Sequence, residues 1–200
     1  MVSQTKTAGR PREFDPDQAL EAAIEVFWRR GFEGTSLSDL TTAMKLSRPS
    51  VYAAFGNKEA LFRKALARYA ETRTAAMDAA LRAPLVKDAV QRFLREFVAS
   101  ATDPATPPGC LTVQGGVTPD ASGPAIHAAL AKVRHDGHAA LTSRLQQAID
   151  EQDLPADSDP ADLALYVTTL TQGIAVQAAS GATRPQLDRV IDRALAAWPR

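Results

Sequence analysis

Apolar side chains recur every three or four residues through most of the chain, which is the spacing of one face of an α-helix. Leu20, Ala23, Ile24 and Phe27 form the first such stripe, and Gly31 ends it. Strand-type alternation is scarce and alanine is abundant. The pattern therefore predicts an all-α fold of about nine helices.

Start and stop signals separate these helices. Asp15 followed by Pro16 is a typical helix start, and Ser36 and Ser47 are suited to cap two short helices. Gly56-Asn57 ends the second short helix and begins a longer one. We expect helices at about residues 16–30, 37–44, 48–55, 58–83, 86–101, 109–114, 125–152, 160–180 and 184–198.

The two short helices, at about residues 36–55, are joined by a tight turn at "KLS" and indicate a helix-turn-helix unit. The second of them is too short to be stable alone. We expect Val51 and Phe55 to fix its inner face to the neighbouring helices. Its outer face would then project rigidly, and the DNA major groove is wide enough to admit one helix.

The charge distribution agrees with a polyanionic partner at this end of the chain. The formal net charge is zero, yet residues 1–75 hold 12 Lys/Arg and 9 Asp/Glu, and residues 76–200 hold 11 and 14. Between Lys45 and Arg73 there are seven basic and two acidic residues. Such a local excess favours binding to nucleic acid at that end, although a solvated helix face has the same charge pattern.

Individual side chains can be given roles in such an interface. Arg48 can pair with a guanine edge or grip a phosphate, Tyr52 can offer its hydroxyl to the DNA backbone, and Lys58 opposes the dipole of its own helix. The predicted DNA-binding residues are Arg10, Arg12, Thr35, Ser36, Ser47, Arg48, Pro49, Ser50, Tyr52 and Lys58. For the serines the alternative is a capping role alone, for Tyr52 packing, and for Arg48 simple solvation.

The stretch "GFEGTSLSDLTTAMKLSRPSVYAAFGNKEALF" resembles the DNA-binding domain of the TetR family of transcriptional regulators. Its matching marks include Gly31-Phe32, Thr35-Ser36, Tyr52 and the run from Lys58 to Leu61, and it departs from the family pattern at Arg48-Pro49. The resemblance implies a symmetric dimer, usually a repressor, that a small molecule entering a helical C-terminal domain releases from a palindromic operator. It divides the chain into a flexible basic arm (1–13), a DNA-binding domain (14–62) and a ligand-binding and dimerisation domain (63–200).

The second half of the chain supplies candidates for dimerisation. The uncharged run from Leu163 to Thr183 approaches the length of a membrane span, but its polar side chains, among them Tyr166, Thr168, Thr169, Thr171, Gln172, Gln177 and Ser180, favour a buried interface helix. Apolar residues on more than one side of this helix need cover from both sides, which a partner subunit can provide. The predicted interface residues are Leu163, Val167, Leu170, Ile174, Val190, Leu195 and Trp198.

A small-molecule pocket is expected among the same helices. Its predicted lining is Phe93, Phe97, Leu111, His135, His138, Tyr166 and Leu170, although ordinary core packing is the favoured explanation for each residue taken singly. His135-x-x-His138 has the spacing of a metal pair without a visible third ligand, and no metal or other cofactor is expected. The single cysteine, Cys110, excludes an internal disulfide framework and suits a reducing cytoplasm.

No signal-peptide core, catalytic triad, phosphate-binding loop or paired-carboxylate site stands out, so an enzyme is not expected. The sequence predicts a cytoplasmic, homodimeric regulator that binds double-stranded DNA and an unidentified inducer. The alternative is a helical small-molecule-binding or structural protein without specific DNA binding.

Overall fold

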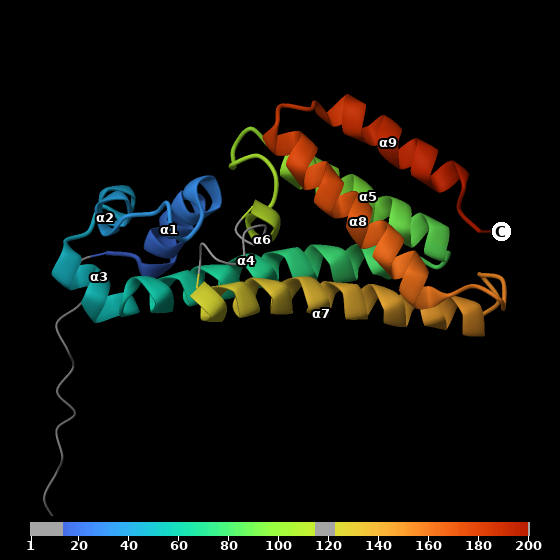
Figure 1. Ribbon diagram of the computed structural model, residues 1–200, viewed down its shortest axis with the longest axis horizontal. Helices are drawn as coiled ribbons and strands as arrows, with labels where there is room; N and C mark the ends of the chain where they lie inside the picture. Colours follow the sequence, from blue (N-terminus) through green and yellow to red (C-terminus); the bar gives the residue numbers. More distant parts are fainter. Residues whose placement is uncertain (1–13, 115–122, 200) are drawn as a thin grey trace, which may run out of the picture.

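The computed structural model describes residues 14–114 and 123–199, and within these residues it contains nine α-helices and no strand (Figure 1). The all-α prediction is confirmed. The helices are α1 (Pro16–Arg30), α2 (Leu37–Met44), α3 (Arg48–Phe55), α4 (Lys58–Leu81), α5 (Val86–Ala101), α6 (Leu111–Gln114), α7 (Gly123–Asp150), α8 (Pro160–Ala179) and α9 (Arg184–Ala196).

Local hydrogen bonds explain where several helices begin. The Asp15 carboxylate accepts the backbone amides of Asp17 and Gln18 at 2.9 and 3.4 Å, and Asn57 caps α4 through the Ala60 amide at 2.8 Å. Side-chain caps of this kind satisfy amides that have no partner inside the helix.

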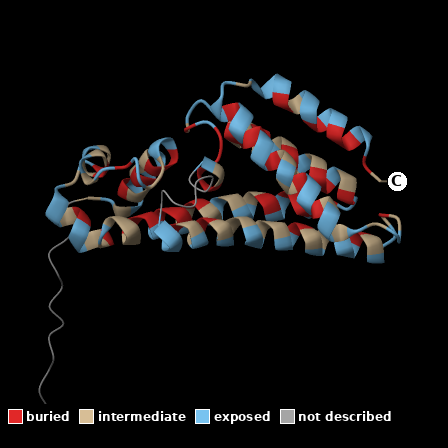
Figure 2. Ribbon diagram, viewed as in Figure 1, coloured by how far each residue is buried: buried red, intermediate tan, exposed pale blue. Residues whose placement is uncertain are grey.

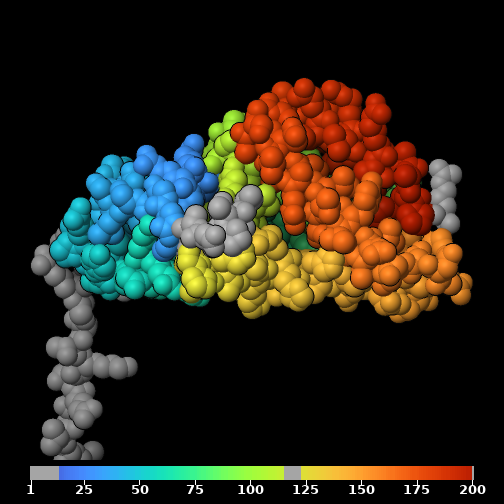
Figure 3. All heavy atoms as spheres, in the orientation of Figure 1, coloured from blue at the N-terminus to red at the C-terminus, as the bar shows by residue number. Residues whose placement is uncertain are grey.

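The helices form two groups along the molecule (Figure 1). Helices α1, α2 and α3 lie at the end where α4 begins, whereas α5 and α7 pack against the remainder of α4 and α8 and α9 lie beyond them. The long helices α4 and α7 run side by side, and α9 lies on the outside against α5. In the space-filling view the N-terminal helices form the left end of the molecule, and α8 and α9 form its upper right part (Figure 3).

Helix α4 crosses the predicted domain boundary without a break, and the cores on either side of it differ (Figure 2). One core lies among α4, α5, α7, α8 and α9. The other joins α1, α2, α3 and the first half of α4 to Cys110, Leu111, Ile126, Leu130 and Ala175. The N-terminal helices therefore share a core with α6, α7 and α8. In a close-packed core, a displacement of α6, α7 or α8 would change the packing of the N-terminal helices.

Arginines link the helices of the larger group. The Arg144 guanidinium on α7 donates to the carbonyls of Leu81, Ala83 and Pro84 at 3.0–3.1 Å, where α4 ends. These carbonyls have no partners inside the helix, and the cation favours the negative end of the helix dipole. Arg95 on α5 pairs with Asp188 and Asp192 on α9.

Four of the predicted dimer-interface residues are core residues of the single chain. Val167, Ile174, Leu195 and Trp198 are each 5% exposed or less, because they face the layer of α5 beneath α8 and α9. Helical periodicity identified an apolar side of α8, but that side is the internal one.

The exposed apolar side of the same two helices is different. Leu165, Tyr166 and Val176 on α8 and the predicted residue Val190 on α9 are 42–58% exposed, and the predicted residues Leu163 and Leu170 are half-buried. No helix among the described residues is long and apolar enough to cross a membrane, α8 included.

Candidate nucleic-acid interface and helical-domain pocket

The turn between α2 and α3 is closed by backbone hydrogen bonds. Lys45 has a left-handed conformation (φ 54°), and the Leu46 amide donates to the Thr41 carbonyl at 3.0 Å. The Ser47 hydroxyl then accepts the Ser50 amide at 3.3 Å and starts α3. Pro49 lies in the first turn of α3. Amides of the first turn have no acceptor inside the helix, so the proline costs no helical hydrogen bond. The tight turn predicted at residues 45–47 is therefore present.

The inner face of α3 is fixed by packing. Val51 and Phe55 are 1% and 5% exposed, and they belong to the core that contains Leu40 and Met44 of α2. Beneath them the rings of Phe27 and Phe62 meet edge to face with centroids 4.9 Å apart. An eight-residue helix is marginal in isolation, so this packing holds α3 in place.

The C-terminal end of α3 has a cation that the sequence reasoning did not identify. The Lys64 ammonium on α4 donates to the Ala54 carbonyl at 3.3 Å and lies 5.6 Å from the centroid of the Phe55 ring. A positive charge at this position stabilises the helix dipole. Lys64 therefore acts as a positioning residue for α3, and its spacing of ten residues from Ala54 gave no sequence signal.

The outer face of α3 is open. Arg48, Pro49 and Tyr52 are exposed, and no ion pair or side-chain hydrogen bond involves Arg48 or Tyr52 within the described residues. Ser50 is half-buried, and its hydroxyl lies 2.8 Å from that of Ser47. A guanidinium and a phenol are thus presented side by side on a rigid helix, the arrangement that reading a groove requires.

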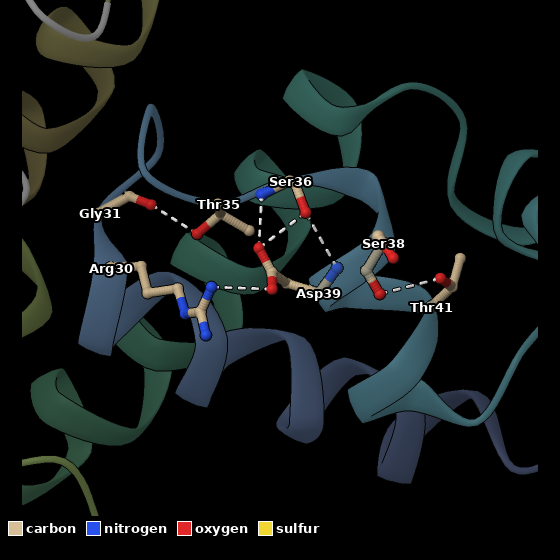
Figure 4. A network of polar contacts seen from close by, with 7 residues as sticks. All are labelled: Arg30, Gly31, Thr35, Ser36, Ser38, Asp39 and Thr41. Atoms are coloured by element: carbon tan, nitrogen blue, oxygen red, sulfur yellow. Dashed lines mark hydrogen bonds and ion pairs between the residues drawn. The ribbon is translucent and has the colours of Figure 1, made fainter.

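A polar network fixes α1 to the start of α2 (Figure 4). The Asp39 carboxylate accepts the Ser36 amide at 2.9 Å, the Ser36 hydroxyl at 2.7 Å and the Arg30 guanidinium at 2.7 Å. The Ser36 hydroxyl in turn accepts the Asp39 amide at 3.1 Å. The hydrogen bonds from Ser36, with the nearby Arg30 charge, hold the pKa of Asp39 below its usual value. The predicted capping role of Ser36 is therefore present.

Thr35 does not fit the predicted DNA contact. Its side chain is 1% exposed and its hydroxyl donates to the Gly31 carbonyl at 2.6 Å (Figure 4). Its backbone amide donates to Phe32. With both donors used internally, Thr35 closes the turn after α1.

Lys58 has a neighbour that the sequence did not reveal. Its ammonium lies 4.4 Å from the centroid of the Phe32 ring, and the side chain is half-buried. A cation–π contact offsets the unfavourable charge at the start of α4. Arg10 and Arg12 lie outside the described residues.

The larger helical group encloses a pocket of about 140 Å³. It lies among α4, α5, α6, α7 and α8, and the predicted residues Phe93, Phe97 and His138 line it. The other predicted lining residues lie elsewhere: Leu111 is fully buried in the N-terminal core, His135 and Tyr166 are on the surface, and Leu170 borders a separate groove beside α9. Within the described residues, no three His, Cys, Asp or Glu side chains gather as a metal site.

One wall of this pocket is a buried hydrogen-bonded chain. The Tyr69 hydroxyl donates to the Cys110 sulfur at 3.3 Å, and that sulfur lies 3.2 Å from the Thr112 hydroxyl. Burial raises the pKa of Tyr69 far above its usual value, so the phenol remains a donor. Arg134 on α7 donates to the Thr112 carbonyl at 2.6 Å, which joins α7 to α6.

Two family models match the chain. Residues 19–65 match that for bacterial regulatory proteins of the tetR family, and residues 86–194 match that for the tetracyclin repressor-like C-terminal domain. The first match covers the helix-turn-helix, and the second covers most of the pocket and the exposed apolar side of α8 and α9.

Individual relatives span nearly the whole chain. The transcriptional repressor ComR of Escherichia coli K12 is 32% identical over 97% of this chain and 93% of its own length. A cysteine mutant of the TetR-family regulator CifR, solved with 26-base-pair operator DNA, is 42% identical with a TM-score of 0.91, over 95% of this chain and all of that one. A TetR regulator from Rhodococcus sp. RHA1 is 39% identical with a TM-score of 0.64, over 92% and 100%.

The Asp39 network predicts a contribution to stability that acid removes. Because the folded-state pKa of Asp39 is lowered, its stabilisation is fully present above the unfolded pKa, about 3.9, and is lost as pH falls through the folded pKa. Urea midpoints measured from pH 7 down to about 2.5 should fall less steeply below about pH 4 in Asp39→Asn than in the unmodified chain.

The matched control for this titration is Asp157→Asn. Asp157 is exposed and has no side-chain hydrogen bond or ion pair within the described residues. Below about pH 4 its urea midpoint should fall as steeply as that of the unmodified chain. An Asp39→Asn midpoint that falls as steeply as that of the control would contradict the role given to the network.

Proposed function

Because the chain belongs to the TetR family of transcriptional regulators, we propose that it represses transcription by inserting α3 into the major groove of an operator. The observation that carries this proposal is the division of α3 into two faces. Val51 and Phe55 are buried, while Arg48 and Tyr52 project without partners within the described residues. Such a repressor acts on the chromosome in the cytoplasm, and we propose no catalytic role.

The side chains around α3 divide into base-reading and phosphate-binding groups. Arg48, in the first turn of α3, would give two parallel hydrogen bonds to a guanine edge. Ser50 would contact DNA by exchanging its hydrogen bond with Ser47. Lys58, Tyr52 and the N-terminal turns of α2 and α3, which begin after Ser36 and Ser47, suit phosphate oxygens. Arg10 and Arg12 would follow the DNA backbone or enter the minor groove.

The exposed apolar side of α8 and α9 suits a second copy of the chain. Val176 and Val190 line a groove that includes Gly173 and Ile174, and Leu165 and Tyr166 are exposed on the same helix α8. Monomeric proteins seldom leave such a surface uncovered. A twofold dimer across it would present two α3 helices, which predicts a palindromic operator with half-sites about one DNA turn apart or slightly more.

The pocket suits an inducer that acts through shared helices. Tyr69 on α4 and Cys110 before α6 lie both in the pocket wall and in the core of the DNA-binding helices. A molecule that moves α4 or α6 would therefore alter how α1 to α3 sit on DNA. We propose this as the route by which ligand releases the operator.

Substitution of Arg48 tests the base-reading role. Duplexes enriched from a random library by the unmodified protein supply the specific site, and a shuffled duplex supplies the reference. Fluorescence anisotropy should show that Arg48→Ala loses about 1–3 kcal/mol of preference at one operator position, while Lys58→Ala weakens both duplexes alike and reduces the salt dependence between about 50 and 200 mM.

The matched control for the DNA measurements is Arg92→Ala, because Arg92 is an exposed arginine on α5, far from α3. It should bind as the unmodified chain does. Equal losses on specific and shuffled DNA from Arg48→Ala would contradict the base-reading role. Failure of the unmodified protein to enrich any sequence would favour a helical binding protein that does not recognise DNA.

The dimer surface makes a separate prediction. Val190→Glu places a charge in the exposed apolar surface, and burying it unpaired against a second copy would be costly. Sedimentation analysis should show a dimer for the unmodified chain and a shift toward monomer for Val190→Glu. Leu85→Glu is the control, since Leu85 is an equally exposed apolar residue before α5. A variant that dimerises as tightly as the control would place the interface elsewhere.

A further inference from the structure

Two arginines line the helical-domain pocket. Arg73 comes from α4 and Arg134 from α7, and both line the cavity. Neither forms an ion pair within 4 Å of a carboxylate among the described residues. In a pocket that is otherwise mostly apolar, two guanidiniums without carboxylate partners are the main chemical feature.

Arg134 is half-buried and only partly used. Its one side-chain hydrogen bond within the described residues goes to the Thr112 carbonyl at 2.6 Å, and a guanidinium carries five N–H donors. Burial lowers the pKa of Arg134, which marks the cost of desolvating its charge. An anion in the pocket would offset that cost.

Arg73 is oriented by aromatic rings. Its guanidinium lies 5.3 Å from the centroid of Phe97 and 5.9 Å from that of Tyr69, and it donates to the Ser100 hydroxyl. Stacking of this kind fixes the plane of the guanidinium and leaves donors at its edge. Glu96 is the one acidic residue of the lining; it is exposed and pairs with neither arginine.

The remainder of the cavity is suited to an apolar body. Met77, Phe93, Val113 and Val133 line it, and the Thr171 and Gln172 side chains supply neutral polar groups. With a volume of about 140 Å³ the space suits a small molecule. Two guanidiniums in a mostly apolar lining favour an amphiphilic ligand with one negative group.

We propose that the ligand of this pocket is a small organic anion, a carboxylate on a short aliphatic or aromatic body, held by Arg73 and Arg134. The inference rests on the proposed function only for its regulatory consequence. Arg134 holds Thr112 on α6, and α6 contacts α1 as well as α7 and α8. A carboxylate that engages Arg134 alters the hold on α6, and α6 carries the change to the DNA-binding helices.

The test compares carboxylates with their neutral isosteres on the full chain. The probes are straight-chain carboxylates of four to ten carbons, benzoate, phenylacetate and 3-phenylpropanoate, each beside its primary amide. Isothermal titration calorimetry should find at least one carboxylate that binds about tenfold or more tightly than its amide, a difference of about 1.4 kcal/mol. Binding by none of the carboxylates, or equal binding by carboxylates and amides, overturns the proposal on the unmodified protein alone.

Variants locate the effect. Arg134→Gln and Arg73→Gln should each remove most of the carboxylate preference, while Arg134→Lys keeps part of it and the exposed Arg92→Gln keeps all of it. Melting followed by circular dichroism confirms that each variant is folded. A preference for carboxylate that survives both Gln substitutions contradicts the assignment of these arginines.

The same samples separate this inference from the proposed function. If the protein binds an enriched operator and no carboxylate binds the protein, the ligand class is wrong and the repressor proposal stands. If a carboxylate binds through Arg134 and no DNA is bound, the ligand class stands and the repressor proposal fails. Release of operator by the carboxylate and not by its amide supports both.

Discussion

The burial of one side of α3 is the constraint on which the account of this protein depends. Eight residues cannot sustain a helix without tertiary support, and here Val51 and Phe55 provide it by inserting into the core of α1, α2 and α4. The Ser47 cap and the Lys64 contact with Ala54 fix the two ends. Because one side of α3 is held, the opposite side is presented in a constant orientation. The backbone that carries Arg48 and Tyr52 would therefore lose little conformational entropy on binding. In the proposed complex with DNA, specificity would follow from this rigidity as much as from the identity of the side chains.

The same core connects recognition to the rest of the chain. Helix α4 is shared, and Cys110, Leu111, Ile126 and Leu130 bring α6 and α7 into contact with the N-terminal helices. Close-packed interiors transmit displacement, so in the proposed mechanism a change in the pocket wall at Tyr69 and Cys110 would reach α1 without a separate hinge. Coupling of two sites through one packed unit is the physical basis expected for a ligand-responsive regulator.

Much of the fold is predictable because short stretches of sequence determine where its helices begin and end. Caps such as Asp15 and Ser36, and the turn before Ser47, act over three or four residues, so the helix order and the helix-turn-helix followed from the sequence. Long-range partners were not predictable: the hold of Lys64 on α3 and of Arg134 on α6 joins residues ten or more positions apart. Periodicity also showed that α8 has apolar residues on several sides, but it could not tell which side the chain itself covers. For this reason the sequence predicts Val167 and Ile174 at a dimer interface, whereas Leu165 and Val176 are the exposed residues.

The central claim is that the outer face of α3 meets the bases of a duplex, and site-specific photocrosslinking tests it most directly. Benzoylphenylalanine in place of Tyr52 should crosslink to nucleotides that line the major groove in each half of an enriched operator, since this side chain is 52% exposed on the outer face of α3. The same group in place of Tyr166, exposed on α8, should give no crosslink to DNA. Crosslinking from position 166 alone, or none from position 52 while the variant remains bound to the operator, would contradict the account.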